Sequence, residues 1–196
     1  MWSQISNIGD AELTLPIALT CAGWLAVSNW RLAVRWIALL AAGMALVGAT
    51  KILYAGCGVA LPAFDFRMIS GHTMLSTSVW TVALAMLWHA FRPGSAPGVA
   101  AGLAIGAVTA VARVFDDSHT VPEVIAGWLL GALVAIVFVR AYVRAPKRSF
   151  SPGAAAVCLL LVSGIAYGHR APFQQMIDTH SPQLCAFVHP AQAGRS

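Results

Sequence analysis

Apolar and polar positions are separated along the chain into long apolar runs and short polar breaks. A helix of about 20 mostly apolar residues spans the core of a bilayer. Six runs approach that length, and they cover residues 13–30, 33–55, 72–91, 97–115, 122–143 and 152–168. The pattern predicts an all-α fold, an integral-membrane bundle of six transmembrane helices that forms one domain over residues 1–196.

The breaks between the runs contain residues typical of turns. The segments RPGSAPG (92–98) and RAPKRSFSPG (144–153) are rich in proline, glycine and serine, which end helices. Within two of the runs, GLAIG (102–106) and GWLLG (127–131) place glycines four residues apart, a pattern that lets membrane helices approach closely. Residues 169–196 follow the last run and are expected to form an external C-terminal tail.

Composition supports a membrane protein and excludes several other classes. The chain is 59% hydrophobic and 10% charged, with a mean hydropathy of +0.75, so it lacks the polar side chains that cover a soluble domain. The net charge of +5 comes from bases scattered between apolar runs, and nucleic acid is therefore not an expected partner. The cysteines lack zinc-like spacings and the six histidines are dispersed, so no metal site is predicted.

The distribution of charges predicts how the chain is oriented. Three of the breaks contain bases and no acids, and these bases are Arg31, Arg35, Arg92, Arg140, Arg144, Lys147 and Arg148. Basic connections stay in the cytoplasm, which places both termini and all seven acids outside. Asp10 and Glu12 precede the first run in place of the basic residues of a signal peptide, so this run is expected to remain as a helix. The expected location is a bacterial inner membrane.

The predicted outer side also gathers the other ionisable groups. The segment ARVFDDSHTVPE (112–123) joins two apolar runs, RMISGHT (67–73) opens another, and Lys51 lies near the end of the second run. Transporters and proton relays usually place such groups at the middle of the bilayer. A location at one interface instead suits a site that binds a lipid headgroup while the tail stays in the membrane.

Each of these pieces has a functional interpretation and a simpler structural one. Ser70, Gly71 and His72 open a helix, whose free N–H groups favour an anion, although Ser70 could merely cap the helix. His119 and Glu123 are four residues apart on one helix face, so the carboxylate could orient the imidazole as a nucleophile. The alternative is an ordinary helix start, where Glu is favoured by the helix dipole.

The basic and acidic side chains nearby are similarly ambiguous. Arg113 could bind a phosphate group through its planar fork of donors, and Lys51 could bind it as a point charge. Both could instead extend from helix ends toward the membrane surface. Asp116 and Asp117 are most simply solvated loop acids. The simpler explanations would each have to be true independently for residues that all lie on one side of the membrane. A single anion-binding site on that side explains the positions of all these residues together.

Taken together, the motifs resemble the type-2 phosphatidic acid phosphatase superfamily. The pattern of that superfamily is Lys-x6-Arg-Pro, then Pro-Ser-Gly-His, then Ser-Arg-x5-His-x3-Asp. This chain has Lys51, then SGH (70–72), then R-x5-H-x3-E from Arg113 to Glu123. The resemblance covers residues 51–123, and the plan of six helices extends it to the rest of the chain.

The resemblance implies a role for each matching residue. His119 would attack phosphorus and form a phosphohistidine, Glu123 would orient it, and His72 would protonate the leaving oxygen. The phosphoryl oxygens would be held by Lys51, Ser70, the Gly71 N–H and Arg113. Neither a metal ion nor another cofactor is implied, because the cationic groups stabilise the charge.

The chain departs from the superfamily pattern at four places. Gly58 and Val59 stand where the first Arg-Pro pair is expected, Ile69 replaces the proline, Ala112 replaces the serine, and Glu123 replaces the aspartate. One phosphate ligand is therefore missing. Arg67 is a candidate replacement, since it precedes Ser70 by three residues. The alternative is that Arg67 faces lipid headgroups and pairs with Asp65.

The leading functional prediction is a metal-independent lipid phosphatase whose active site faces the periplasm. Candidate substrates are a polyprenyl pyrophosphate, a phosphatidylglycerol phosphate and a lipid A phosphate, and the expected partners are this substrate and membrane lipids. A phosphotransferase of the same fold and a non-catalytic lipid-binding or transport protein are the alternatives, while a vanadate haloperoxidase is disfavoured for so small a membrane chain. A Cys57–Cys185 disulfide could hold the tail over the site, because both residues lie on the outer side.

Overall fold

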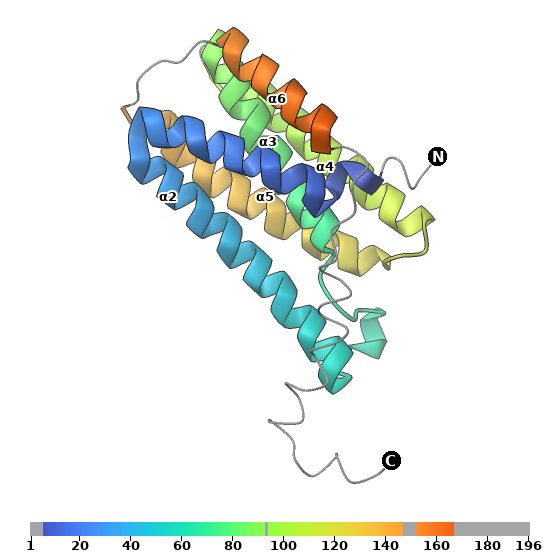
Figure 1. Ribbon diagram of the computed structural model, residues 1–196. Helices are drawn as coiled ribbons and strands as arrows, with labels where there is room; N and C mark the ends of the chain where they lie inside the picture. The colour runs from blue at the N-terminus through green and yellow to red at the C-terminus, as the bar shows by residue number, and fades with distance from the viewer. Residues whose placement is uncertain (1–5, 93, 147–151, 167–196) are drawn as a thin grey trace.

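The computed structural model of the protein describes residues 6–92, 94–146 and 152–166, and over this part of the chain the structure is helical (Figure 1). The α-helices are α2 (Ala11–Cys57), α3 (Gly71–Phe91), α4 (Ala96–Phe115), α5 (Val121–Arg144) and α6 (Pro152–Ala166). Two short 3-10 helices, η1 (Asn7–Gly9) and η2 (Pro62–Phe64), complete the set. The predicted all-α fold is confirmed.

Helix α2 contains two of the predicted apolar runs and bends sharply between them. At Asn29 the backbone is extended, with φ −164° and ψ 99°. The Asn29 side-chain oxygen accepts a hydrogen bond from the Arg31 N–H at 3.2 Å, as an N-cap residue does, and its amide nitrogen donates to the Pro146 carbonyl at 3.0 Å. Figure 1 shows the two arms of α2 folding back from this bend.

Four helices of the described chain are long and apolar enough to cross a membrane, namely α2, α3, α4 and α5. The bend divides α2 into two arms, and α6 is a shorter apolar helix of 15 residues. The structure is therefore compatible with an integral membrane protein. The predicted count of six spans is not confirmed and belongs to the proposed topology.

Helix α3 packs closely against both α4 and α5, and glycines allow the contacts. A Cβ atom at Gly102 of α4 would collide with the backbone of Thr81 in α3. A Cβ atom at Gly127 of α5 would lie 2.5 Å from the Ser70 carbonyl oxygen, at the beginning of α3. The prediction that the two spaced glycine pairs serve close helix approach is thus confirmed, and the second pair brings the beginnings of α3 and α5 together.

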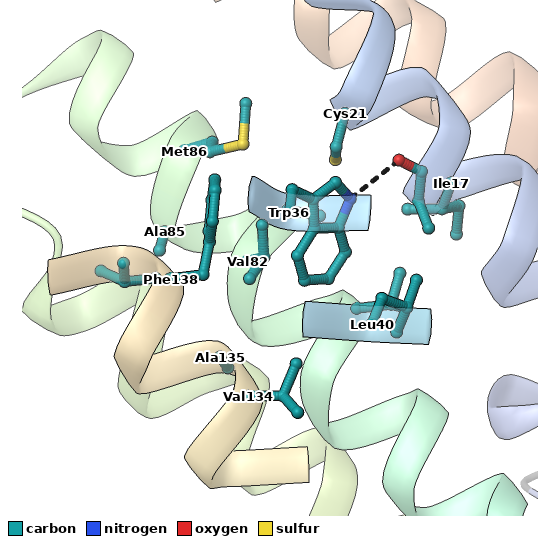
Figure 2. Packing of buried hydrophobic residues seen from close by; sticks show 14 of the residues in the cluster. Ile17, Cys21, Trp36, Leu40, Val82, Ala85, Met86, Val134, Ala135 and Phe138 are labelled. Carbon is teal, nitrogen blue, oxygen red and sulfur yellow. Dashed lines mark hydrogen bonds between the residues drawn. The ribbon is translucent and has the colours of Figure 1, made fainter. Parts of the chain in front are cut away.

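The apolar core joins both arms of α2 to α3 and α5 (Figure 2). Trp36 is fully buried at its centre, and its indole N–H donates to the Ala18 carbonyl of the other arm at 3.0 Å. The Trp36 ring also packs against Phe138 of α5, with ring centroids 5.3 Å apart. The hydrogen bond from Trp36 to the Ala18 carbonyl joins the two arms of α2. It helps to set the direction in which the second arm carries Lys51 toward the start of α3.

Two of the cysteines are free thiols: Cys21, which is buried, and Cys158, which is exposed. Cys57, at the end of α2, is disulfide-bonded. Cys185 lies outside the described residues, so the predicted Cys57–Cys185 pairing stays a prediction.

Candidate active site

His119 and Glu123 form a buried pair at the start of α5. Thr120 is the N-cap residue of this helix and Glu123 is its third residue, where the carboxylate reaches back to accept from the Thr120 N–H at 3.2 Å. The same carboxylate oxygen, Oε2, lies 2.7 Å from Nδ1 of His119. The His119 residue is 9% exposed and Glu123 is fully buried. Because Nδ1 donates to the carboxylate, the lone pair of the imidazole lies on Nε2.

The other carboxylate oxygen of Glu123 faces the segment that precedes α3. Oε1 accepts from the Arg67 N–H at 3.0 Å, from Arg67 Nε at 3.1 Å and from the Met68 N–H at 3.4 Å. The two oxygens together meet donors and no acceptor in these contacts, which are the surroundings of a carboxylate and not of a carboxylic acid. Glu123 therefore holds His119 in one tautomer.

The start of α3 lies directly beside this pair. The Ser70 N–H donates to the backbone carbonyl of Glu123 at 3.2 Å, and the buried Ser70 hydroxyl shares a hydrogen bond of 3.0 Å with Thr73. A Cβ atom on Gly71 would lie 4.0 Å from the Lys51 ammonium nitrogen. The first turn of α3, whose N–H groups favour anions, and a cation of α2 thus meet at one place.

Arg113, in the last turn of α4, supports the same site with its backbone and its side chain. Its carbonyl accepts from the N–H groups of Ser118 and His119, at 3.2 and 3.3 Å, which fixes the loop that carries His119. Its guanidinium donates from Nη1 to the Ser6 hydroxyl at 3.0 Å. Nε is buried and has no hydrogen-bond partner among the described residues.

The electrostatics of the site favour a neutral His119. Burial lowers the pKa of His119 most strongly, the hydrogen bond to Glu123 opposes that shift, and the charges of Arg113 and Lys51 lower the pKa further. On Arg67, the hydrogen bond to Glu123 raises the pKa of the guanidinium, which stays protonated. The site therefore combines a neutral imidazole, whose Nε2 can attack, with cations that attract a phosphate.

The structure brings the predicted site residues together at one end of the bundle. His72, the second residue of α3, is within electrostatic range of Lys51, Arg113 and His119. Of the two loop acids, Asp117 is exposed, as expected of a solvated acid, and Asp116 is half-buried.

Two features of the site were not predicted from the sequence. The sequence predicts that Arg67 binds phosphate or pairs with Asp65, and the structure adds a contact between its side chain and Glu123. Ser6 accepts a hydrogen bond from Arg113, and no sequence motif indicates this contact. The two partners in this second contact are 107 residues apart, and an isolated serine before a 3-10 helix gives no signal of it.

The structure gives a physical reason for the missing arginine at position 58. Gly58 ends α2 in the left-handed region, with φ +66°, where residues with side chains are strained. Its N–H donates to the Tyr54 carbonyl at 3.0 Å, and the next N–H, that of Val59, donates to the Leu53 carbonyl at 3.1 Å. This is the hydrogen-bond pattern of a glycine that terminates a helix. The position serves helix termination in this chain.

Comparison with known proteins agrees with the motifs. The family model of the PAP2 superfamily matches residues 57–147. A protein of Klebsiella pneumoniae described as an uncharacterized 22.5 kDa protein in cps region is 33% identical over 197 residues, which cover 96% of this chain and 92% of the relative. No solved structure matches the chain. By its sequence, from the end of α2 through the two histidine motifs to the end of α5, the chain belongs to the PAP2 superfamily.

Proposed function

We propose that this protein is an integral-membrane lipid phosphatase that cleaves a phosphate or pyrophosphate monoester at the outer face of the membrane. Members of the superfamily are generally phosphatases, so membership supports the reaction class. The observation that carries the proposal is the buried His119–Glu123 pair, 2.7 Å apart, beside the first turn of α3. This geometry supports nucleophilic catalysis by the histidine.

The proposed reaction has two steps. In the first, His119 Nε2 forms a bond to phosphorus while the bond from phosphorus to the leaving oxygen breaks, and His72 donates a proton to that oxygen. In the second, water attacks the phosphohistidine, His72 accepts a proton from the water, and the bond between nitrogen and phosphorus breaks to release phosphate. Glu123 stabilises the positive charge that forms on His119.

The remaining site residues would hold the phosphoryl oxygens. Lys51 and Arg113 are the cations proposed for this task, together with the Ser70 hydroxyl and the Gly71 N–H. The hydrogen bond from the Ser70 N–H to the Glu123 carbonyl joins α3 to α5 and holds the Ser70 and Gly71 donors beside the start of α5 before substrate arrives. Donors that are fixed in advance stabilise developing charge without reorganisation.

The position of the site in the bundle favours a lipid substrate. The residues proposed to bind phosphate lie at the ends of apolar helices, where a headgroup would be presented while its tail stays in the membrane. The proposed topology has six spans, with both arms of α2 and α6 counted separately and the site facing the periplasm of a bacterial inner membrane. A polyprenyl pyrophosphate, a phosphatidylglycerol phosphate and a lipid A phosphate fit this arrangement.

Phosphate release by the purified protein in detergent tests the proposal. The wild type should release phosphate from at least one of these lipids with EDTA present, and vanadate should inhibit competitively. His119→Ala should abolish release, whereas His89→Ala, at the other end of α3, should retain it. Transfer of the phosphoryl group to an added alcohol in place of water would favour the phosphotransferase alternative. No release from any lipid would favour a non-catalytic lipid-binding protein.

A further inference from the structure

Arg67 contacts Glu123 on the oxygen that does not face His119. Oε1 accepts from the Arg67 N–H at 3.0 Å and from Arg67 Nε at 3.1 Å, while Oε2 lies 2.7 Å from His119 Nδ1. The carboxylate thus links a cation to the histidine. We propose that Arg67 is a positioning residue that acts on His119 through Glu123, fixing the carboxylate and balancing its charge, and that it does not hold the substrate phosphate. The inference rests on the proposed function.

A buried carboxylate needs such a partner. Glu123 is fully buried, and removing a charge from water is costly unless it is paired and hydrogen-bonded. Within the described part of the chain, Arg67 supplies the one Lys or Arg side chain that forms a salt bridge with Glu123. Without it, the full negative charge of the carboxylate would act on the adjacent imidazole. That charge would hold a proton on His119 more tightly and reduce the fraction of His119 with a free Nε2.

The segment that carries Arg67 is itself fastened to the helices around the site. The Thr120 hydroxyl donates to the Asp65 carbonyl at 2.6 Å, and the Ile69 N–H donates to the Thr50 hydroxyl at 3.1 Å. These bonds attach residues 65–70 to the start of α5 and to α2. A second contact orients the guanidinium, because its central carbon lies 5.9 Å from the centroid of the Tyr54 ring.

The charges around His119 determine the sign of the effect. Every element packed at the site contributes a titratable or charged group: Lys51 of α2, Arg67 of the segment before α3, His72 of α3, Arg113 of α4 and Glu123 of α5. In this group Glu123 is the anion that favours protonation of His119, and the charges of Arg113 and Lys51 oppose it. Removing Arg67 takes away a positive charge. His119 should therefore take up its proton at a higher pH in the variant than in the wild type.

The test compares Arg67→Ala with Arg92→Ala, an exposed arginine at the other end of α3. Two quantities are measured: the pH profile of kcat/KM, and the titration midpoint of His119 from nitrogen NMR of histidine-labelled protein. In Arg67→Ala both the acidic limb and the midpoint should move up by roughly one unit, the lower end of the range of about 1–3 units for a charge in close contact, because Arg67 contacts Glu123 and not His119 itself. KM should stay within about twofold. Arg92→Ala should change nothing.

Two further variants keep the test decisive. Arg67→Lys retains the charge and should shift the midpoint less than Arg67→Ala, and it serves if the alanine variant does not fold. In a Glu123→Gln background, Arg67→Ala should shift the midpoint much less, because the carboxylate through which it acts is gone.

The outcomes separate this inference from the proposed function. A tenfold rise in KM with an unchanged midpoint would make Arg67 a phosphate ligand and would overturn the inference. An unchanged or lowered midpoint with unchanged kinetics would also overturn it. If the wild type hydrolyses no lipid phosphate, the proposed function fails, and the NMR titration still decides whether Arg67 acts on His119.

Discussion

Replacing Glu123 by glutamine changes its chemistry with little change in shape. The carboxylate accepts from His119 Nδ1 and the Thr120 N–H on one oxygen, and from the segment at Arg67 and Met68 on the other. Glutamine has one acceptor oxygen and one NH2 group that only donates. If its oxygen faces Arg67, the NH2 group faces His119. Nδ1 must then accept, the imidazole proton moves to Nε2, and the nitrogen proposed to attack loses its lone pair.

The expected loss follows from the contacts. A buried hydrogen bond to a charged group contributes about 1.5–3 kcal/mol. If it is lost only in the transition state, kcat/KM falls by roughly 10- to 150-fold. The unfavourable tautomer adds to this loss, so Glu123→Gln should reduce kcat/KM by at least about 100-fold. Glu123→Asp keeps the charge and should remain within about tenfold of the wild type.

The assay is the initial rate of phosphate release from one lipid phosphate over a range of concentrations. Thermal unfolding of each variant in detergent confirms that the fold is retained, and nitrogen NMR of the labelled histidines reports which ring nitrogen of His119 carries the proton. A Glu123→Gln variant within about threefold of wild-type kcat/KM, with a folded structure, would refute this account of the pair.

Three other predictions follow from the fold and the site. Gly127→Ala should lower both activity and melting temperature, because its Cβ would lie 2.5 Å from a backbone oxygen of α3 and overpacking costs about 1–3 kcal/mol, whereas Gly23→Ala, with nothing within 4 Å, should leave activity unchanged. Reporter fusions in the connection 92–98 should read cytoplasmic and a fusion after Arg195 external, and a cytoplasmic C-terminus would contradict six spans. Burial lowers the pKa of His119, so its neutral form persists as the pH falls. The acidic limb of the pH profile of kcat/KM should therefore lie below pH ~6.5, the ordinary pKa of histidine. An acidic limb above that value would contradict the assignment of His119 as the nucleophile.

Much of the fold could be predicted because membrane helices are encoded locally. The apolar runs 72–91, 97–115 and 122–143 match α3, α4 and α5 closely, since length and hydropathy suffice to define a helix in a bilayer. The bend in α2 could not be placed at Asn29 from hydropathy. It depends on a side chain that caps the second arm and on a contact with the Pro146 carbonyl, 117 residues away.

The sequence indicates which residues form the candidate site, but it does not predict all the contacts between them. The spacing of His119 and Glu123 predicts a pair on one helix face, because residues four apart are neighbours on a helix. The two side chains do meet, but His119 precedes the N-cap Thr120 and lies outside the helix, and the contact forms because Glu123 in the first turn of α5 reaches back over the N-cap. The contact between Arg67 and Glu123 joins positions 56 residues apart. It arises because the segment before α3 lies against the start of α5, where Gly127 allows the two backbones to approach closely. Sequence spacing alone suggests Asp65 as an ion-pair partner for Arg67 and gives no signal of its contact with Glu123.

The central claim is that His119 carries the phosphoryl group during turnover. The most direct measurement is rapid acid-free quenching of the protein with a labelled lipid phosphate, followed by mass mapping of the labelled peptide. The account predicts a phosphate that is labile in acid and stable in base, located on His119 and absent from His119→Ala. A labelled intermediate on another residue, or full turnover by His119→Ala, would contradict it.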